Sequence, residues 1–124
     1  MDPTFGDPYY LKAMINDGLP ALFGGDKYQM SVDLKKALDL DPSNYTYLVD
    51  GAIAHLNRGW DVKKKQIEAR KKGASDDGSP SDMSDKEYAK VLIKKAVDMF
   101  KNDGDRTLKE KKVIETGITI SEKL

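Results

Sequence analysis

The fold is decided by the stretch Ala37-Leu38-Asp39-Leu40-Asp41-Pro42-Ser43-Asn44, which closes one amphipathic helix and opens the next. Before it, apolar residues recur at helical spacing, at Met30, Leu34, Ala37 and Leu38. Pro42 has no N–H to donate and disfavours helical angles at the residue before it, so the first helix must end here. Ser43 or Asn44 can cap the second helix by accepting from its free N–H groups. Two helices joined by so short a turn are expected to pack antiparallel.

Similar signals along the chain predict further helices. Asp7 followed by Pro8 is a good helix start, and Asp26 can cap a helix that runs to about Leu40. The strongest apolar stripes lie at offsets 0, 3, 4, 7, 8 and 11 from Tyr45, and again from Ala89. Helices are predicted over residues 7–18, 26–40, 44–58, 60–72 and 84–102, with a short basic helix from residue 107. The sequence therefore predicts an all-α fold, either antiparallel helix–turn–helix repeats or a small bundle of five to six helices.

Two segments are expected to be irregular. Residues 73–83 combine glycine, proline, serine and aspartate, and predict a flexible, solvated acidic loop. Residues 117–124 form a tail that alternates weakly around Gly117, which predicts either a short strand or a frayed end. Capping boxes at Ser84–Glu87 and Thr107–Glu110 mark two helix starts. Apart from the loop and the tail, residues 1–124 are expected to form a single helical domain.

Composition excludes several classes of protein. The chain has 124 residues and no cysteine, so disulfides, thiolate nucleophiles and cysteine-based metal sites are excluded. Lysine plus arginine and aspartate plus glutamate both number 21, so the whole chain offers no net attraction to nucleic acid or anionic lipid. It has no apolar run of the roughly 20 residues that span a bilayer, and no secretory signal at its start. We therefore expect a soluble cytoplasmic protein that does not associate with membranes.

Glycines are spaced as in a helical repeat. Gly59 lies 34 residues after Gly25, and Gly104 lies 45 residues after Gly59, with the acidic loop between them. A period near 34 with a helix–turn–helix unit is typical of a solenoid array. On Gly25-Asp26, residues 37–42 and Asn44, the chain resembles the tetratricopeptide repeat. The resemblance covers about residues 8–116 in two to three repeats and is sharpest between Gly25 and Gly59.

This resemblance implies a non-enzymatic adaptor, assembly or chaperone-like module that binds a protein or peptide. In the family, the first helices of successive repeats line a concave groove. The matching positions are Tyr45, Leu48, Ala52, His55 and Leu56 in the second repeat, and Lys94, Asp98 and Lys101 in the third. The lysines would select acidic segments, and the exposed end faces of so short an array favour self-association. The alternative is that Tyr45, Leu48 and Leu56 are simply core residues.

No constellation of side chains predicts catalysis or a cofactor. His55 is the only histidine, and a lone histidine on an apolar helix is more often a packing or surface residue than a base. With one histidine and no cysteine, the chain cannot supply a typical zinc site. The acidic loop lacks the EF-hand spacing, because Ser84 stands where a calcium-binding glutamate belongs. We expect no metal, no cofactor and no enzymatic activity.

Runs of basic residues suggest a second class of function. They lie at residues 63–65, 70–72, 94–95 and 109–112. If antiparallel helices bring these runs onto one face, the chain could bind phosphate groups or nucleic acid despite its zero net charge. The alternative is that they are solvated helix exteriors.

Overall fold

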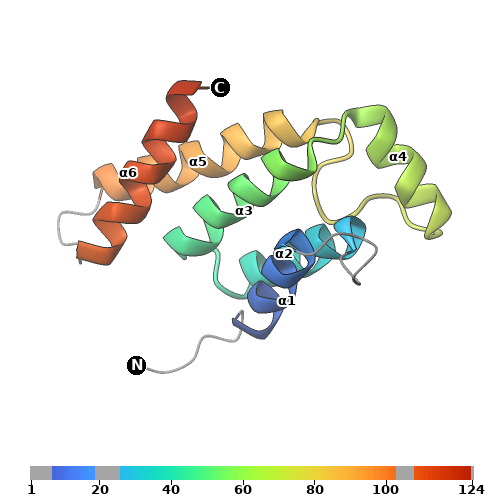
Figure 1. Cartoon of the computed structure of the whole chain (residues 1–124), viewed down its shortest axis with the longest axis horizontal. Coiled ribbons are helices and arrows are strands. Elements are labelled where there is room, and N and C mark those ends of the chain that lie inside the picture. The colour runs from blue at the N-terminus through green and yellow to red at the C-terminus, as the bar shows by residue number, and fades with distance from the viewer. Residues whose placement is uncertain (1–6, 19–25, 103–107, 124) are drawn as a thin grey trace.

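The computed structural model describes residues 7–18, 26–102 and 108–123, and these residues form six α-helices without a strand. The all-α prediction is therefore confirmed. The helices are α1 (Asp7–Gly18), α2 (Lys27–Leu40), α3 (Tyr45–Arg58), α4 (Val62–Lys71), α5 (Asp85–Asn102) and α6 (Leu108–Lys123). Figure 1 shows α4 at one end of the molecule and α6 at the other, with α3 and α5 side by side between them.

Helices begin where the sequence provides a side chain for the free N–H groups of the first turn. Asp26 caps α2 by accepting from two backbone N–H groups at 3.0 Å. Asn44 caps α3 by accepting from the N–H three residues later, also at 3.0 Å. Ser84 and Glu87 form the predicted capping box ahead of α5, with reciprocal hydrogen bonds of 3.2 and 3.1 Å. These local bonds explain why the boundaries were predictable.

The turn between α2 and α3 lies where Pro42 predicts it. Helix α2 ends at Leu40, where the N–H of Asp41 donates to the carbonyl of Ala37 at 2.9 Å, and α3 begins at Tyr45. The chain reverses direction across this turn, and the two helices are in contact (Figure 1).

The core is built where the helices pack against one another in pairs. Helix α1 packs along α2, α3 packs along α5, and α6 contacts both α3 and α5. Helix α1 also reaches α3 through Tyr10, whose ring stacks on Tyr47 with centroids 4.8 Å apart and whose hydroxyl donates to Asp50. The largest fully buried apolar side chains are those of Met30, Leu34, Tyr47, Leu48, Val49 and Ile93.

Two glycines allow helices to approach closely. A Cβ atom on Gly51 of α3 would lie 2.8 Å from Cδ2 of Leu34 on α2. A Cβ atom on Gly117 of α6 would lie 3.3 Å from Cγ2 of Val49 on α3. In both places the missing side chain lets a neighbouring side chain pack directly against the helix backbone.

The C-terminal tail is helical, so the short strand predicted as one form of residues 117–124 is wrong. Helix α6 continues to Lys123 and gives no sign of a strand across residues 117–123. Gly117 and Ile120 are three residues apart, which places both on the same side of a helix. Gly117 is buried and Ile120 packs against the core, so contacts with the helices favour a helical tail over an extended one.

Helix α4 stands apart from the core. It begins at Val62, two residues later than predicted, because Asp61 caps it by accepting from the N–H of Lys64 at 2.8 Å. Only Lys65 and Ala69 of this helix are buried. Helix α3 packs most extensively against α5 and not against α4, its neighbour in sequence.

Candidate functional site

A buried ion cluster joins the end of α3 to the start of α5 and to the loop before it. The guanidinium of Arg58 donates to both carboxylate oxygens of Asp85, from Nε to Oδ2 and from Nη2 to Oδ1, each at 2.7 Å. Its Nη1 atom lies 2.7 Å from Oδ2 of Asp77. All three side chains are 1% exposed or less. A bidentate pair of this kind has strongly preferred geometry, so it fixes the three segments relative to one another.

The remaining positions around the two carboxylates are occupied as well. Nδ1 of His55 lies 2.7 Å from Oδ1 of Asp85, and the backbone N–H of Trp60 donates to Oδ2 of Asp85 at 2.7 Å. An ionised carboxylate can only accept, so Nδ1 of His55 carries the proton. Oδ1 of Asp77 accepts from the N–H of Ser79 at 3.0 Å and from its hydroxyl. Each buried charge therefore has close partners.

Burial and the charge of Arg58 have opposite effects on the pKa values of the two carboxylates in this cluster. Burial alone raises the pKa of Asp85, but hydrogen bonds from His55 and Arg58 and the charge of Arg58 outweigh it, lowering the pKa to about 2. The same competition lowers the pKa of Asp77, where the Arg58 charge and Ser79 outweigh burial. Burial lowers the pKa of His55, because a protonated imidazole would be a buried cation, and the positive charge of Arg58 lowers it as well. The cluster therefore holds two carboxylates, one guanidinium and a neutral imidazole.

This cluster is closed to a substrate. The ring of Tyr88 contacts the imidazole of His55 edge-on, with ring centroids 4.9 Å apart. The ring centroid of the Trp60 indole lies 4.2 Å from Cζ of Arg58. The side chain of His55 is only 1% exposed. A general base has to reach a substrate proton within hydrogen-bond distance, which this histidine cannot do in the folded protein. The arrangement is suited to holding the loop in place.

The acidic loop is anchored, so the prediction that it is solvated is wrong for part of its length. Its irregular conformation over residues 73–83 was predicted, but Asp77 and Ser79 are buried. The ammonium group of Lys65 donates to the carbonyls of Pro80 and Met83 at 2.9 and 2.8 Å. Because Asp77 pairs with Arg58, and Lys65 binds the loop backbone, the loop is held from both α3 and α4.

Acid is expected to destabilise the fold through this cluster. The folded pKa of Asp85, about 2, lies below its ordinary value of 3.8, so its contribution is present above pH 4 and lost as the pH falls toward 2. That shift corresponds to about 2 kcal/mol of unfolding free energy. The pKa of His55 is lower in the folded protein than in the unfolded chain. Below about pH 6.5 the unfolded chain therefore binds a proton that the folded protein does not, which removes further stability. Urea unfolding across this pH range measures the loss, and an unchanged unfolding free energy would contradict the assignment.

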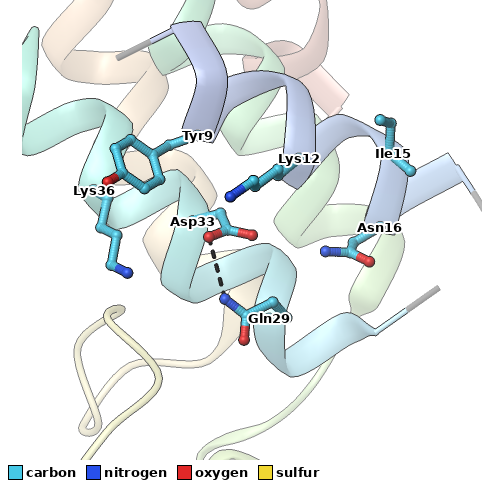
Figure 2. A pocket seen from close by; sticks show the side chains of 7 residues that line it. All are labelled: Tyr9, Lys12, Ile15, Asn16, Gln29, Asp33 and Lys36. Atoms are coloured by element: carbon cyan, nitrogen blue, oxygen red, sulfur yellow. Dashed lines mark hydrogen bonds between the residues drawn. The ribbon is translucent and has the colours of Figure 1, made fainter. Parts of the chain in front are cut away.

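A shallow groove of about 420 Å³ lies between α1 and α2. Figure 2 shows the lining residues, which are Tyr9, Lys12, Ile15 and Asn16 on α1 and Gln29, Asp33 and Lys36 on α2. The ammonium groups of Lys12 and Lys36 lie 5.7 and 5.3 Å from the Tyr9 ring centroid. Asp33 is 4% exposed and accepts from Gln29 at 3.1 Å. Two lysines and one carboxylate line this groove, so its charges partly cancel.

A second hollow, of about 390 Å³, lies on the outer surface of α5. Its floor is mainly apolar and includes Val91, which is 45% exposed, and Met99. Lys94, Lys95 and Asp98 complete its lining. An apolar floor bordered by two lysines can accept an apolar side chain whose neighbours are acidic.

The structure does not bring the predicted binding residues into one groove. Four of them are buried, with exposures of 6%, 1%, 0% and 1% for Tyr45, Leu48, Ala52 and His55. They pack inside the protein and are not accessible to a partner in this structure. The reason is that α5 and α6 cover the face of α3 that the repeat pattern would leave open.

The other predicted residues are divided between separate places. Leu56 is partly buried and lines a hollow beside Trp60, at the opposite end of α3 from Tyr45. Lys94 is exposed and lines the hollow on α5, together with Asp98. Lys101 belongs to α5, but its side chain lies outside the described part of the structure. The basic runs are divided too: α4 and α6 lie at opposite ends of the molecule, so their lysines do not merge into one face (Figure 1).

Sequence reasoning missed the ion cluster. Arg58 was predicted only as the last residue of a helix, Asp77 only as part of the acidic loop, and Asp85 only as part of a capping box. Arg58 and Asp85 are 27 residues apart, and no local pattern shows that the loop returns to the end of α3. Within the described ranges, no group of three or more histidine, aspartate or glutamate side chains is placed to hold a metal ion.

Comparisons with known proteins leave the family assignment as a prediction. Among the helices described, none has both the length and the apolar character needed to cross a bilayer. The tetratricopeptide resemblance rests on the residues between Gly25 and Gly59. No protein-family model matches the chain, and no match was found among curated proteins or among solved structures.

Proposed function

We propose that the chain is a non-enzymatic module that binds a peptide or a protein segment through the hollow on α5. The observation that carries this proposal is the exposure of Val91, 45%, on a mainly apolar floor that also includes Met99. Apolar surface left open in a recess is typical of a binding site, because burying it is favourable by about 25 cal/mol per Å². Lys94, one of the positions implied by the tetratricopeptide resemblance, lines the same hollow.

The chemistry of the lining defines the ligand. An aliphatic side chain of the partner would pack between Val91 and Met99. Acidic residues beside it would lie near the ammonium groups of Lys94 and Lys95, while Asp98 would disfavour a carboxylate at its end of the hollow. The expected ligand is therefore a short segment with one buried aliphatic residue and acidic residues on one side of it.

Selection of binding peptides from a displayed random library tests this proposal. We expect enrichment of an aliphatic residue flanked by aspartate or glutamate. Val91→Glu should weaken the selected peptides by about tenfold or more, because it removes apolar contact and repels their acidic residues. Titration calorimetry gives the affinities, and circular dichroism checks that helicity is retained.

Leu11→Glu is the matched control, since Leu11 is 57% exposed on α1 and lies outside the hollow. It should leave peptide affinity unchanged. The proposal is wrong if no peptide is enriched, or if both variants lower affinity equally.

A further inference from the structure

Helix α4 carries four of its five cations on one face. Five exposed side chains of this helix lie at offsets 0, 1, 4, 7 and 8 counted from Lys63. They are Lys63, Lys64, Ile67, Arg70 and Lys71. At 3.6 residues per turn, these five positions fall within an arc of about 120°. We call the four cations the basic face of α4.

The opposite side of α4 is held against the protein. Lys65 is 2% exposed, and its ammonium group donates to two carbonyls of the loop. Ala69 is 1% exposed on the same side. Because these contacts fix the rotation of α4 about its axis, the basic face is turned outward. Helix α4 itself lies at one end of the molecule (Figure 1).

The positive charge of this face is little compensated. Glu68 is the only acidic residue of α4, and its Oε1 atom lies 3.1 Å from Nζ of Lys64 and 3.2 Å from Nζ of Lys71. Within the part of the chain that the structure describes, Lys63 and Arg70 form no ion pair. The whole chain has zero net charge, so this concentration of cations is a local feature.

We propose that the basic face of α4 binds the phosphodiester backbone of a nucleic acid. The positive charge of this face identifies the partner, because cations alone are sufficient to bind phosphates and no apolar recess is needed. A protein partner would need apolar surface to bury, and Ile67, 38% exposed, is the only large exposed apolar side chain on this helix. The four cations span about 12 Å along a convex helix, and a helix of this kind fits the major groove of a duplex.

This binding is expected to be independent of base sequence, because the contacts are with phosphates. It uses a different helix from the hollow on α5. Failure of peptide binding there and failure of nucleic-acid binding at α4 are therefore separable results.

Fluorescence anisotropy of the full chain with labelled duplex DNA, and with single-stranded RNA of the same length, tests the proposal. The affinity is measured between about 50 mM and about 200 mM salt. With four phosphate contacts, the slope of log affinity against log salt should be about −3 to −4 for duplex DNA, and shallower for the single strand. The double variant Lys63→Gln with Arg70→Gln should bring the duplex slope to about −2.

The matched control is Lys35→Gln with Lys90→Gln, which removes the same charge from exposed positions on α2 and α5. It should keep the full slope. Both variants alter exposed side chains, and circular dichroism should show unchanged helicity. If the double variant loses helicity, Lys63→Gln alone should still reduce the slope by about one.

Three results would overturn the proposal. One is no binding to either nucleic acid at the lower salt concentration. Another is an equal loss of slope in the double variant and its control. The third is tighter binding of an acidic peptide of equal charge than of either nucleic acid, which would assign the basic face to a protein partner.

Discussion

Replacing Asp85 by alanine is expected to lower the free energy of unfolding by about 3–5 kcal/mol. The change leaves the guanidinium of Arg58 buried with Asp77 as its only carboxylate, and removes the acceptor for the N–H groups of His55 and Trp60. A domain of this size is stabilised by about 5–15 kcal/mol in total. Urea unfolding followed by circular dichroism should show a midpoint shifted far toward low denaturant.

Asp82→Ala is the matched control for this substitution. Asp82 is an exposed acid of the same loop, so its removal should change the unfolding free energy by no more than about 0.5 kcal/mol. A loss at Asp85 as small as that at Asp82 would show that the cluster does not hold the loop and the two helices together.

Leu48→Glu is expected to prevent folding, and Leu48→Ala to cost about 2–5 kcal/mol. Leu48 is 1% exposed on α3, inside the core that α3 forms with the neighbouring helices. A carboxylate there would be buried without a partner, which is a far larger penalty than the cavity left by alanine. Thermal unfolding followed by circular dichroism distinguishes the unaltered protein from the two variants, Leu48→Ala and Leu48→Glu.

The same experiment decides whether Leu48 belongs to the core or to a binding groove. Leu11→Ala, at a position 57% exposed, is the control and should melt close to the unaltered protein. If Leu48→Glu keeps its helicity and melting temperature, Leu48 lies on the surface and the groove implied by the tetratricopeptide resemblance regains support.

Much of the secondary structure was predictable because its causes are local. Asp26, Asn44 and the pair Ser84–Glu87 each bond to backbone groups within three residues, so the sequence around them is sufficient to place a helix start. Pro42 and the apolar stripes act over similarly short distances. The tail was misjudged in part because Gly117 looked like an interruption, although it is where α6 packs against Val49.

The candidate sites were less predictable because they depend on which helices meet. The tetratricopeptide resemblance selected Lys94 and Asp98, and they do line one hollow. Tyr45, Leu48, Ala52 and His55 have the same helical spacing, but α3 is covered, so they are buried. A stripe shows that a helix has an apolar side and does not show what lies against it.

By itself, the sequence determined the helices, the turn at Pro42 and the even balance of charge, since backbone hydrogen bonds, caps and side-chain periodicity act between near neighbours. Only the tertiary structure decided that α3 packs with α5, that the basic face of α4 is turned outward, and that Arg58 meets Asp77 and Asp85. These outcomes depend on burial and ion pairing between segments far apart in the chain. Such interactions are favourable only when the whole arrangement excludes water, so no local stretch of sequence can specify them.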